Sequence, residues 1–177
     1  MTAADRRYAV LFDRDGVLNV DHGYAHRPDQ LEWIDGAKAA VAALNRAGVL
    51  VLVVTNQSGV ARGYYGEADV DGFHAAMQED LAGEGAQIDG FYICPYLADA
   101  PVEQYRHPDH PDRKPNPGML VRALQDFAVE PANALMIGDR ESDMQAAAAA
   151  GVAGHRFHGG DLAAFLERIL AGTDFPR

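Results

Sequence analysis

The stretch Tyr8-Ala9-Val10-Leu11-Phe12-Asp13-Arg14-Asp15-Gly16 places two carboxylates at the end of an apolar run. The run has the character of a buried strand, and the glycine after it favours a turn. Because side chains at positions i and i+2 of an extended chain point to the same side, Asp13 and Asp15 can converge on one small volume. Two unneutralised carboxylates repel each other, which a divalent cation would relieve. The alternative interpretation is a polar Asx turn that only caps a strand.

Three later apolar or loop segments of the chain also end in side chains that could bind a ligand or take part in a reaction. A β-branched run ends in Thr55, whose hydroxyl suits contact with an anion or forms part of an ordinary polar turn. The Arg113 guanidinium can bind two oxygens of a phosphate at once, and the Lys114 ammonium supplies a compact positive charge. The alternative is that both residues lie in a solvated loop. Another apolar run ends in Asp139, which can complete a metal site with the first acids. Asp143 either joins that site or favours the start of a helix.

The order of acid pair, hydroxyl, cation and acid along the chain resembles the motifs of the haloacid dehalogenase-like phosphatase superfamily. The matching stretches are Asp13-Arg14-Asp15-Gly16-Val17-Leu18, Thr55-Asn56-Gln57-Ser58-Gly59, Arg113-Lys114-Pro115 and Gly138-Asp139-Arg140-Glu141-Ser142-Asp143. The resemblance extends from about residue 8 to about residue 157, which is nearly the whole chain. It is specific because the four motifs occur together and in order.

The resemblance implies hydrolysis of a phosphomonoester through an aspartyl-phosphate intermediate. It implies that Asp13 is the nucleophile, and that Asp15 protonates the leaving alcohol and then deprotonates the attacking water. Thr55 and Lys114 would hold the transferring oxygens. Mg²⁺ would be held by Asp13, Asp139 and Asp15, the last through its main-chain carbonyl.

Three stretches narrow the resemblance to the heptose bisphosphate phosphatases: Asn19 to Tyr24, Thr55 to Tyr64 and Lys114 to Leu120. Residues 19–28 are here called the flap. The implied reaction removes the 7-phosphate of D-glycero-D-manno-heptose 1,7-bisphosphate. Histidinol-phosphate phosphatases share the catalytic motifs but match the flap and Ala61-Arg62-Gly63 less well. Histidinol phosphate and other small sugar phosphates are the alternative substrates. The flap can grip a polyhydroxylated substrate or exclude water. By resemblance the expected substrate contacts are Asp21, His22, Gly23, Tyr24, Asn56, Gln57, Ser58, Arg62, Arg113 and Arg140.

The long segment from Cys94 to Pro117 departs from the family pattern, in which Cys-x-His and Cys-x-Cys bind zinc. Here Cys94 is retained, but Tyr96 replaces the histidine, and His110 and Asp112 replace the later cysteines. Three mixed groups make a poor closed zinc site, so we expect no structural zinc. We expect His107 and His110 to be solvated loop residues.

Two non-enzymatic functions are alternatives. A receiver-like module also combines acids, threonine and lysine on a parallel α/β fold, but its phosphorylated aspartate follows the third strand. Here that position reads Cys94-Pro95-Tyr96, whereas the acid pair follows the first strand. A catalytically silent sugar-phosphate binder is the other alternative. Steady turnover of a phosphomonoester would distinguish an enzyme from both.

The composition is that of one globular domain spanning residues 1–177, with 48% apolar residues. Fifteen basic and 26 acidic residues give a net charge of −11, which argues against non-specific binding to nucleic acid or an anionic membrane. An anionic substrate therefore needs a local positive patch. The candidates for that patch are Arg62, Arg113, Lys114 and Arg140.

Apolar runs alternate with helical patterns, which predicts a doubly wound, mainly parallel α/β sheet without a separate cap domain. Helices are expected around residues 37–44, 70–81, 120–127, 144–150 and 162–170, and Thr173 to Arg177 is expected to be a loose tail. Met1 to Arg7 lacks a signal-peptide core, and no apolar run approaches the ~20 residues of a membrane span. We expect a cytoplasmic protein and leave its oligomeric state open.

Overall fold

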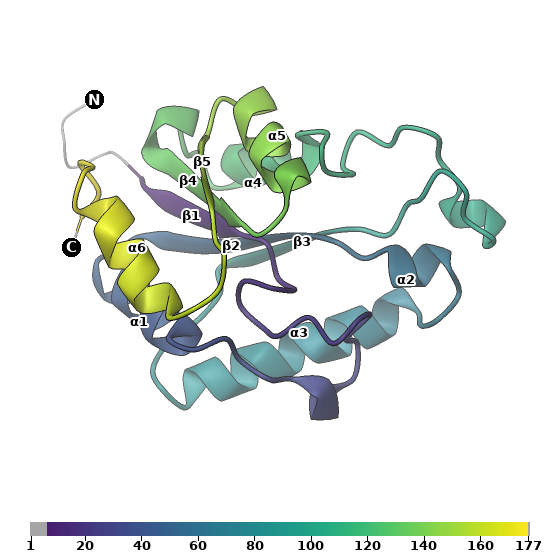
Figure 1. Ribbon diagram of the computed structural model, residues 1–177, viewed down its shortest axis with the longest axis horizontal. Coiled ribbons are helices and arrows are strands. Elements are labelled where there is room, and N and C mark those ends of the chain that lie inside the picture. Colours follow the sequence, from purple (N-terminus) through teal and green to yellow (C-terminus); the bar gives the residue numbers. More distant parts are fainter. Residues whose placement is uncertain (1–6, 177) are drawn as a thin grey trace.

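The computed structural model describes residues 7–176, in which five parallel strands form one sheet in the order β3-β2-β1-β4-β5 (Figure 1). The strands are β1 (Ala9–Phe12), β2 (Leu50–Asn56), β3 (Gly90–Cys94), β4 (Ala134–Gly138) and β5 (Ala153–Arg156). Residues 1–6, which carry most of the stretch expected to lack a signal-peptide core, lie outside the described residues. The predicted doubly wound parallel fold is confirmed.

Helices cover both faces of this sheet (Figure 1). They are α1 (Ala37–Arg46), α2 (Ser58–Ala61), α3 (Glu67–Ala82), α4 (Gly118–Asp126), α5 (Glu141–Ala149) and α6 (Leu162–Leu170), with short 3-10 turns at Pro28–Gln30, Glu103–Tyr105 and Pro131–Asn133. The five predicted helices are confirmed. The sequence patterns missed α2, which is a single turn, and β5, which is a mostly exposed edge strand without an apolar run.

Strand β1 lies at the centre of the sheet and is buried on both sides. Val10 and Phe12 pack toward the cluster that includes α1, α3 and α6, whereas Ala9 and Leu11 pack toward α4 and α5. A strand covered on both faces has no solvent side, so its sequence is continuously apolar rather than alternating. This burial explains why the first apolar run of the chain clearly predicts a strand.

The carboxyl-terminal edge of the sheet is where the site forms. The chain leaves β1 between its neighbours β2 and β4, and the N–H of Asp13 donates to the carbonyl of Ile137 at 2.9 Å. The connection from β1 leads to α1 on one face of the sheet, and the connection from β4 leads to α5 on the other face. This divergence opens a crevice beyond the strand ends. Four polar segments meet there because parallel strands bring their carboxyl ends to one edge.

The expected loose tail is wrong for its described part. Phe175 is buried and its ring packs against that of Tyr8, with centroids 4.9 Å apart. The N–H of Phe175 also donates to the Thr173 hydroxyl at 3.3 Å. An aromatic side chain closes the apolar gap beside the start of β1, so burial orders a segment whose sequence is short and polar.

Within the described part of the chain, no helix combines the length and the apolar character needed to cross a bilayer.

Candidate active site

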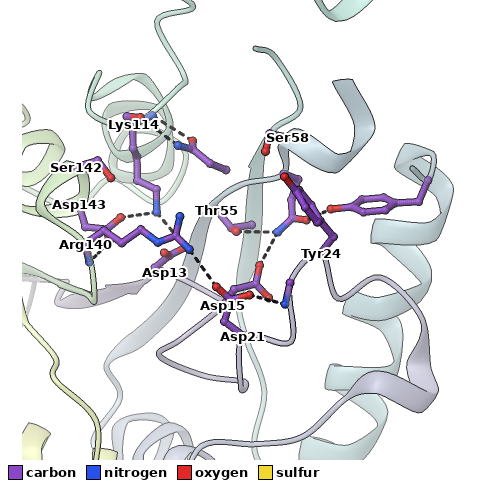
Figure 2. Close-up of a pocket in the computed structure, with 14 residues that line it drawn as sticks. Asp13, Asp15, Asp21, Tyr24, Thr55, Ser58, Lys114, Arg140, Ser142 and Asp143 are labelled. Carbon is purple, nitrogen blue, oxygen red and sulfur yellow. Dashed lines mark hydrogen bonds and ion pairs between the residues drawn. The ribbon is translucent and has the colours of Figure 1, made fainter. Parts of the chain in front are cut away.

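A pocket of about 300 Å³ opens at the carboxyl-terminal edge of the sheet (Figure 2). Its walls combine acids, two cations, hydroxyls and amides. The lining residues are Asp13, Asp15, Asp21, Gly23, Tyr24, Thr55, Asn56, Gln57, Ser58, Tyr65, Lys114, Arg140, Ser142 and Asp143. Segments up to 130 positions apart in the sequence thus converge on one concave surface.

Lys114 lies buried between two acids at the base of the pocket. Its Nζ is 3.0 Å from Asp13 Oδ1 and 2.6 Å from Asp143 Oδ1, and it donates to the carbonyl of Val54 at 2.9 Å. Burial disfavours the charged ammonium, but the Asp13 and Asp143 carboxylates outweigh it and raise the pKa of Lys114. The lysine therefore stays charged and neutralises part of the acidic cluster.

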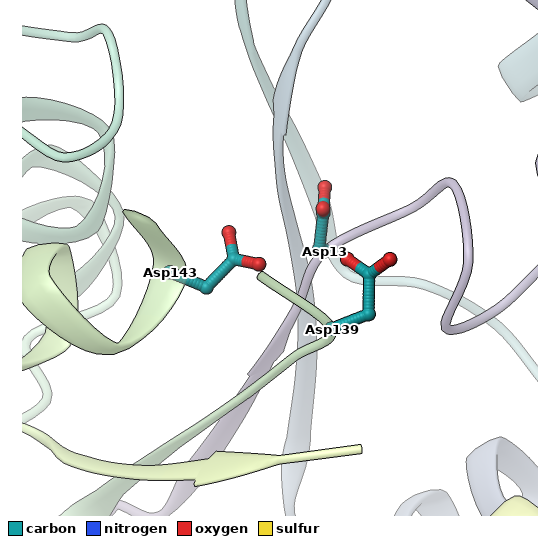
Figure 3. A group of neighbouring side chains, drawn as sticks. All are labelled: Asp13, Asp139 and Asp143. Carbon is teal, nitrogen blue, oxygen red and sulfur yellow. The ribbon is translucent and has the colours of Figure 1, made fainter. Parts of the chain in front are cut away.

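Asp13, Asp139 and Asp143 form an acid cluster in which one ligand oxygen of each residue lies within 4.8 Å of the others (Figure 3). Burial, offset in part by Lys114, raises the pKa of Asp13 to about 6, and burial likewise raises the pKa of Asp139. Oδ1 of Asp139 is buried without a hydrogen-bond partner. Carboxylate oxygens in this arrangement match the ligand preference of a hard divalent cation.

Two glycines make room for the acid cluster. A Cβ on Gly16 would lie 2.5 Å from Asp139 Oδ2, and Gly16 also has a φ of +86°, which side chains rarely adopt. A Cβ on Gly138 would collide with the side chain of Asp143. The glycines that follow Phe12-Asp13-Arg14-Asp15 and end β4 are therefore needed for close approach of the carboxylates.

Asp143 combines the two roles that the sequence left open. Its Oδ2 accepts a hydrogen bond from the N–H of Arg140 at 3.0 Å, which satisfies a free donor at the start of α5. Its Oδ1 pairs with Lys114 in the pocket. Asp143 thus belongs both to the helix start and to the site.

Asp15 faces the same pocket as Asp13 but its carboxylate has a different set of partners. It accepts from the Arg14 guanidinium, from Asn19 Nδ2 at 2.9 Å and from Gln57 Nε2 at 3.0 Å. Its carboxylate is not part of the acid cluster described above. The two acids therefore converge on one pocket, as expected, while only the first contributes a carboxylate to the cluster.

The Gln57 amide links the Asp15 carboxylate with the hydroxyl of Thr55. Its Nε2 donates to Asp15 Oδ2 and to Thr55 Oγ1, each at 3.0 Å, and its Oε1 accepts from the Tyr65 hydroxyl at 2.9 Å. Burial raises the pKa of Tyr65 to about 12, so this phenol remains a donor. Tyr65 and Ser142 also line the pocket. Tyr65 lies outside the four motifs, and Ser142 lies within the last motif but was not among the predicted site residues.

The flap contacts the pocket through its tip. Asp21 Oδ2 accepts a hydrogen bond from Arg140 Nη2 at 3.0 Å across the pocket mouth. Tyr24 has a φ of 60°, an uncommon conformation for a bulky residue, and its ring meets that of Tyr64 edge-on at 4.9 Å. His22 points elsewhere and pairs with Glu32 at 2.7 Å.

Three of the expected substrate contacts lie outside the pocket lining: His22, Arg62 and Arg113. The Arg113 guanidinium donates to the carbonyl of Tyr96 at 2.9 Å, so it holds the loop after β3. The Nε of Arg62 is buried without a hydrogen-bond partner. Of the four cations expected to form a positive patch, Lys114 and Arg140 reach the pocket.

Aromatic contacts hold the loop between β3 and α4. The His110 ring stacks on Tyr96 at 3.9 Å with an interplanar angle of 7°, so the expectation of a merely solvated His110 is wrong. Asp112 pairs with Arg122 at 2.6 Å. Cys94 is buried at the end of β3, and burial raises the pKa of its thiol.

Comparisons with known proteins agree with this geometry. Residues 19–151 match the family model described as haloacid dehalogenase-like hydrolase. The chain is 42% identical over 172 residues to the D-glycero-beta-D-manno-heptose-1,7-bisphosphate 7-phosphatase of Rhodopseudomonas palustris, covering 96% of this chain and 94% of the relative. It is 44% identical over 144 residues to the Escherichia coli K12 protein of the same name, covering 81% of this chain and 75% of the relative.

A solved structure shows the same fold. It is the D,D-heptose 1,7-bisphosphate phosphatase from B. bronchiseptica complexed with magnesium and phosphate. The superposition has a TM-score of 0.77 at 32% sequence identity and covers 96% of this chain and 89% of that chain.

Proposed function

Since this chain belongs to the haloacid dehalogenase-like hydrolases, and is a phosphatase, we propose that it removes the 7-phosphate of D-glycero-β-D-manno-heptose 1,7-bisphosphate through an aspartyl-phosphate on Asp13. The observation that carries this proposal is the arrangement of Asp13 against a buried Lys114 in a pocket that also holds Asp15. Nucleophile, cation and second acid are the groups that phosphoryl transfer through a covalent intermediate requires.

The Asp13 carboxylate is held through one oxygen. Oδ1 accepts from the N–H of Arg14 at 2.8 Å and lies 3.0 Å from Lys114 Nζ. We assign the attack to Oδ2: the Oδ2–P bond forms as the bond from phosphorus to the ester oxygen breaks. Asp15 gives its proton to the departing oxygen, then takes a proton from the water that attacks phosphorus, and the Oδ2–P bond breaks to release phosphate.

Thr55 is set to donate toward the transferring phosphoryl group. Its Oγ1 already accepts a hydrogen bond from Gln57 Nε2, so its own hydrogen is directed elsewhere. Lys114 adds a positive charge at the base of the pocket. Donors fixed in advance stabilise the charge on the phosphoryl oxygens without reorganising during the reaction.

Mg²⁺ fits the acid cluster, because Asp13, Asp139 and Asp143 supply carboxylates, and Asp139 Oδ1 has no hydrogen-bond partner and lies 4.0 Å from Arg140 Nε. When bound, the ion would neutralise charge on the phosphoryl oxygens and on the acids that surround them. The main-chain carbonyl of Asp15 remains a proposed further ligand. Asp143 joins the set that the sequence motifs suggested.

The rest of the substrate is assigned to the pocket mouth. Arg140 is mostly exposed and is held there by Asp21, so it can meet a second anionic group of the substrate. Tyr24 offers an aromatic surface to the sugar. We propose Gly23, Asn56 and Ser58 as further contacts, with one domain carrying the whole site.

The lone cysteine is consistent with a reducing compartment, and we propose a cytoplasmic location for the reaction. The proposed partner is a small phosphorylated sugar.

The test is phosphate release by the purified protein with Mg²⁺ and both anomers of the heptose 1,7-bisphosphate, fructose 1,6-bisphosphate and histidinol phosphate. We expect steady turnover of a heptose bisphosphate, with phosphorus NMR showing loss of the 7-phosphate. Asp13→Asn should lower kcat at least about a thousandfold, because its amide cannot form the acyl phosphate. The control is Asp126→Asn, an exposed acid that accepts from the Tyr92 hydroxyl. Substrate binding without turnover would contradict the proposal.

A further inference from the structure

Arg14 separates the two acids of the first motif, and its side chain is completely buried. A buried guanidinium is strongly unfavourable unless its charge is paired and its N–H groups are hydrogen-bonded. The side chain is too enclosed to meet a substrate, and it does not line the pocket. The reason for a buried cation at this position must therefore lie in the groups that Arg14 contacts.

The Arg14 guanidinium donates hydrogen bonds to both oxygens of the Asp15 carboxylate. Nε and Nη2 lie 3.2 and 2.9 Å from Asp15 Oδ1, and Nη2 lies 2.9 Å from Oδ2. Nη2 also donates to the carbonyl of Ala25 in the flap at 2.6 Å. The forked geometry of arginine fixes the direction of a carboxylate as well as neutralising it.

Side chains from α3, one of them stacked on β3, pack against the Arg14 guanidinium on the side away from the pocket. The Arg14 guanidinium carbon lies 4.4 Å from the centre of the Phe73 ring, and Nη1 is 3.4 Å from His74 Nε2. Burial and the Arg14 charge lower the pKa of His74 to about 3, so the ring is neutral and Nε2 serves as the acceptor. His74 in turn stacks on Phe91 at 4.1 Å.

We infer that Arg14 is a positioning residue for the reaction: its guanidinium holds the Asp15 carboxylate in the orientation from which Asp15 exchanges a proton with the leaving oxygen. This inference rests on the proposed function. The buried side of the carboxylate is occupied by Arg14 and by Asn19, whereas Gln57 holds it on the pocket side. The contact with Gln57 is the one that a leaving oxygen can replace, since Arg14 has no access to the pocket.

The test compares two esters in each variant. Loss of a general acid affects an alkyl phosphate, whose alkoxide leaves poorly, far more than 4-nitrophenyl phosphate, whose leaving group needs no proton. We expect Arg14→Met to lower kcat/KM for fructose 1,6-bisphosphate or a heptose bisphosphate at least about tenfold, and for 4-nitrophenyl phosphate less than about threefold. Arg14→Lys keeps the charge without the fork and should show the same selectivity.

A double-variant measurement separates positioning from folding. In an Asp15→Asn background, Arg14→Met should change kcat/KM for either ester by less than about twofold, because the group that Arg14 positions is already lost. The double variant also leaves no unpaired charge in the interior, so it should fold even where Arg14→Met alone is unstable. Melting temperatures accompany each measurement.

Arg122→Met is the matched control. Arg122 also combines a carboxylate, Asp112 at 2.6 Å, with an aromatic ring, Tyr92 at 5.4 Å, but on the protein surface. Its replacement should leave both esters unaffected.

The possible failures can be told apart. If Asp15→Asn is selective between the esters but Arg14→Met lowers both equally, or lowers activity further in the Asp15→Asn background, Arg14 acts on folding and the inference is overturned. If Asp15→Asn itself shows no selectivity, the proposed acid is wrong and the inference falls with it.

Discussion

At the scale of single residues, four aspartates at one sheet edge differ because their neighbours differ. Asp13 and Asp143 share the ammonium of Lys114, whereas Asp15 is held by the guanidinium of Arg14. Asp139 Oδ1 has no hydrogen-bond partner. A carboxylate held by a forked guanidinium keeps one orientation, while a cluster of three carboxylates around one lysine attracts a further cation. Chemically identical side chains thereby acquire distinct roles.

The raised pKa of Asp13 predicts that magnesium binding depends on pH. Without metal this pKa is about 6, so below that pH the proton and Mg²⁺ compete for the carboxylate. As pH falls below about 6, the apparent Kd for Mg²⁺ should rise by about tenfold per unit, and as pH rises above it the dependence should disappear.

Calorimetric titration of Mg²⁺ into EDTA-treated protein at pH 5 and pH 8 measures this dependence. Buffers of different ionisation enthalpy report the protons released, and we expect about one at pH 5. Asp13→Asn should bind more weakly but lose most of the pH dependence. Equal affinity at both pH values in the wild type would contradict the assignment of Asp13 as a ligand.

At the scale of elements, the single turn α2 supports the catalytic edge through one contact. Gly59 in this turn has no side chain, and a Cβ there would collide with the ring of Tyr65. The Tyr65 hydroxyl holds the Gln57 amide, which in turn contacts Asp15. The packing of α2 against Tyr65 therefore helps to position Gln57 and, through it, the Asp15 carboxylate.

We predict that Gly59→Ala destabilises the protein by about 1–3 kcal/mol and lowers kcat, because the added methyl group displaces Tyr65 and with it Gln57. The measurements are chemical denaturation and phosphate release. Gly72→Ala is the control: Gly72 lies in α3, and a Cβ there meets nothing within 4 Å. That substitution should stabilise the protein by about 0.5–1 kcal/mol and leave kcat unchanged. Similar stabilities for the two variants would contradict this account.

At the scale of the whole molecule, the residues of the candidate active site and the packing of the C-terminal segment lie at opposite ends of the strands. The pocket lies beyond the carboxyl ends of the strands, and the packing of Phe175 on Tyr8 lies beside the start of β1. Figure 1 shows the start of β1 and the end of α6 at the same side of the molecule. Changes at that side alter the folded fraction without moving the site.

Phe175→Ala should therefore lower the free energy of unfolding by about 3 kcal/mol while kcat stays at the wild-type value, since the variant removes a buried ring far from Asp13. Urea denaturation and kcat below the melting transition measure the two effects. Val121→Ala, at a partly exposed position in α4, is the control and should change stability by less than about 0.5 kcal/mol. A wild-type melting temperature for Phe175→Ala would show that the tail does not pack as described.

The sequence by itself determined the strands β1 to β4, their alternation with helices and the order of chemical groups at the strand ends. These features are local: an apolar run buried on both faces reads as a strand, and parallel strands bring their ends to one edge. The sequence was less informative where burial has no local pattern, as at the edge strand β5 and the packed Phe175.

Only the tertiary structure decided which partner each group takes. Lys114 meets the carbonyl of Val54 across 60 positions, Arg14 meets His74 across 60, and Arg140 meets Asp21 across 119. No periodicity or motif spacing encodes such contacts, because they depend on how helices pack on the sheet and on what that packing excludes from water. The interior then sets the chemistry: burial raises the pKa of Asp13, keeps His74 neutral and obliges Arg14 to pair with Asp15.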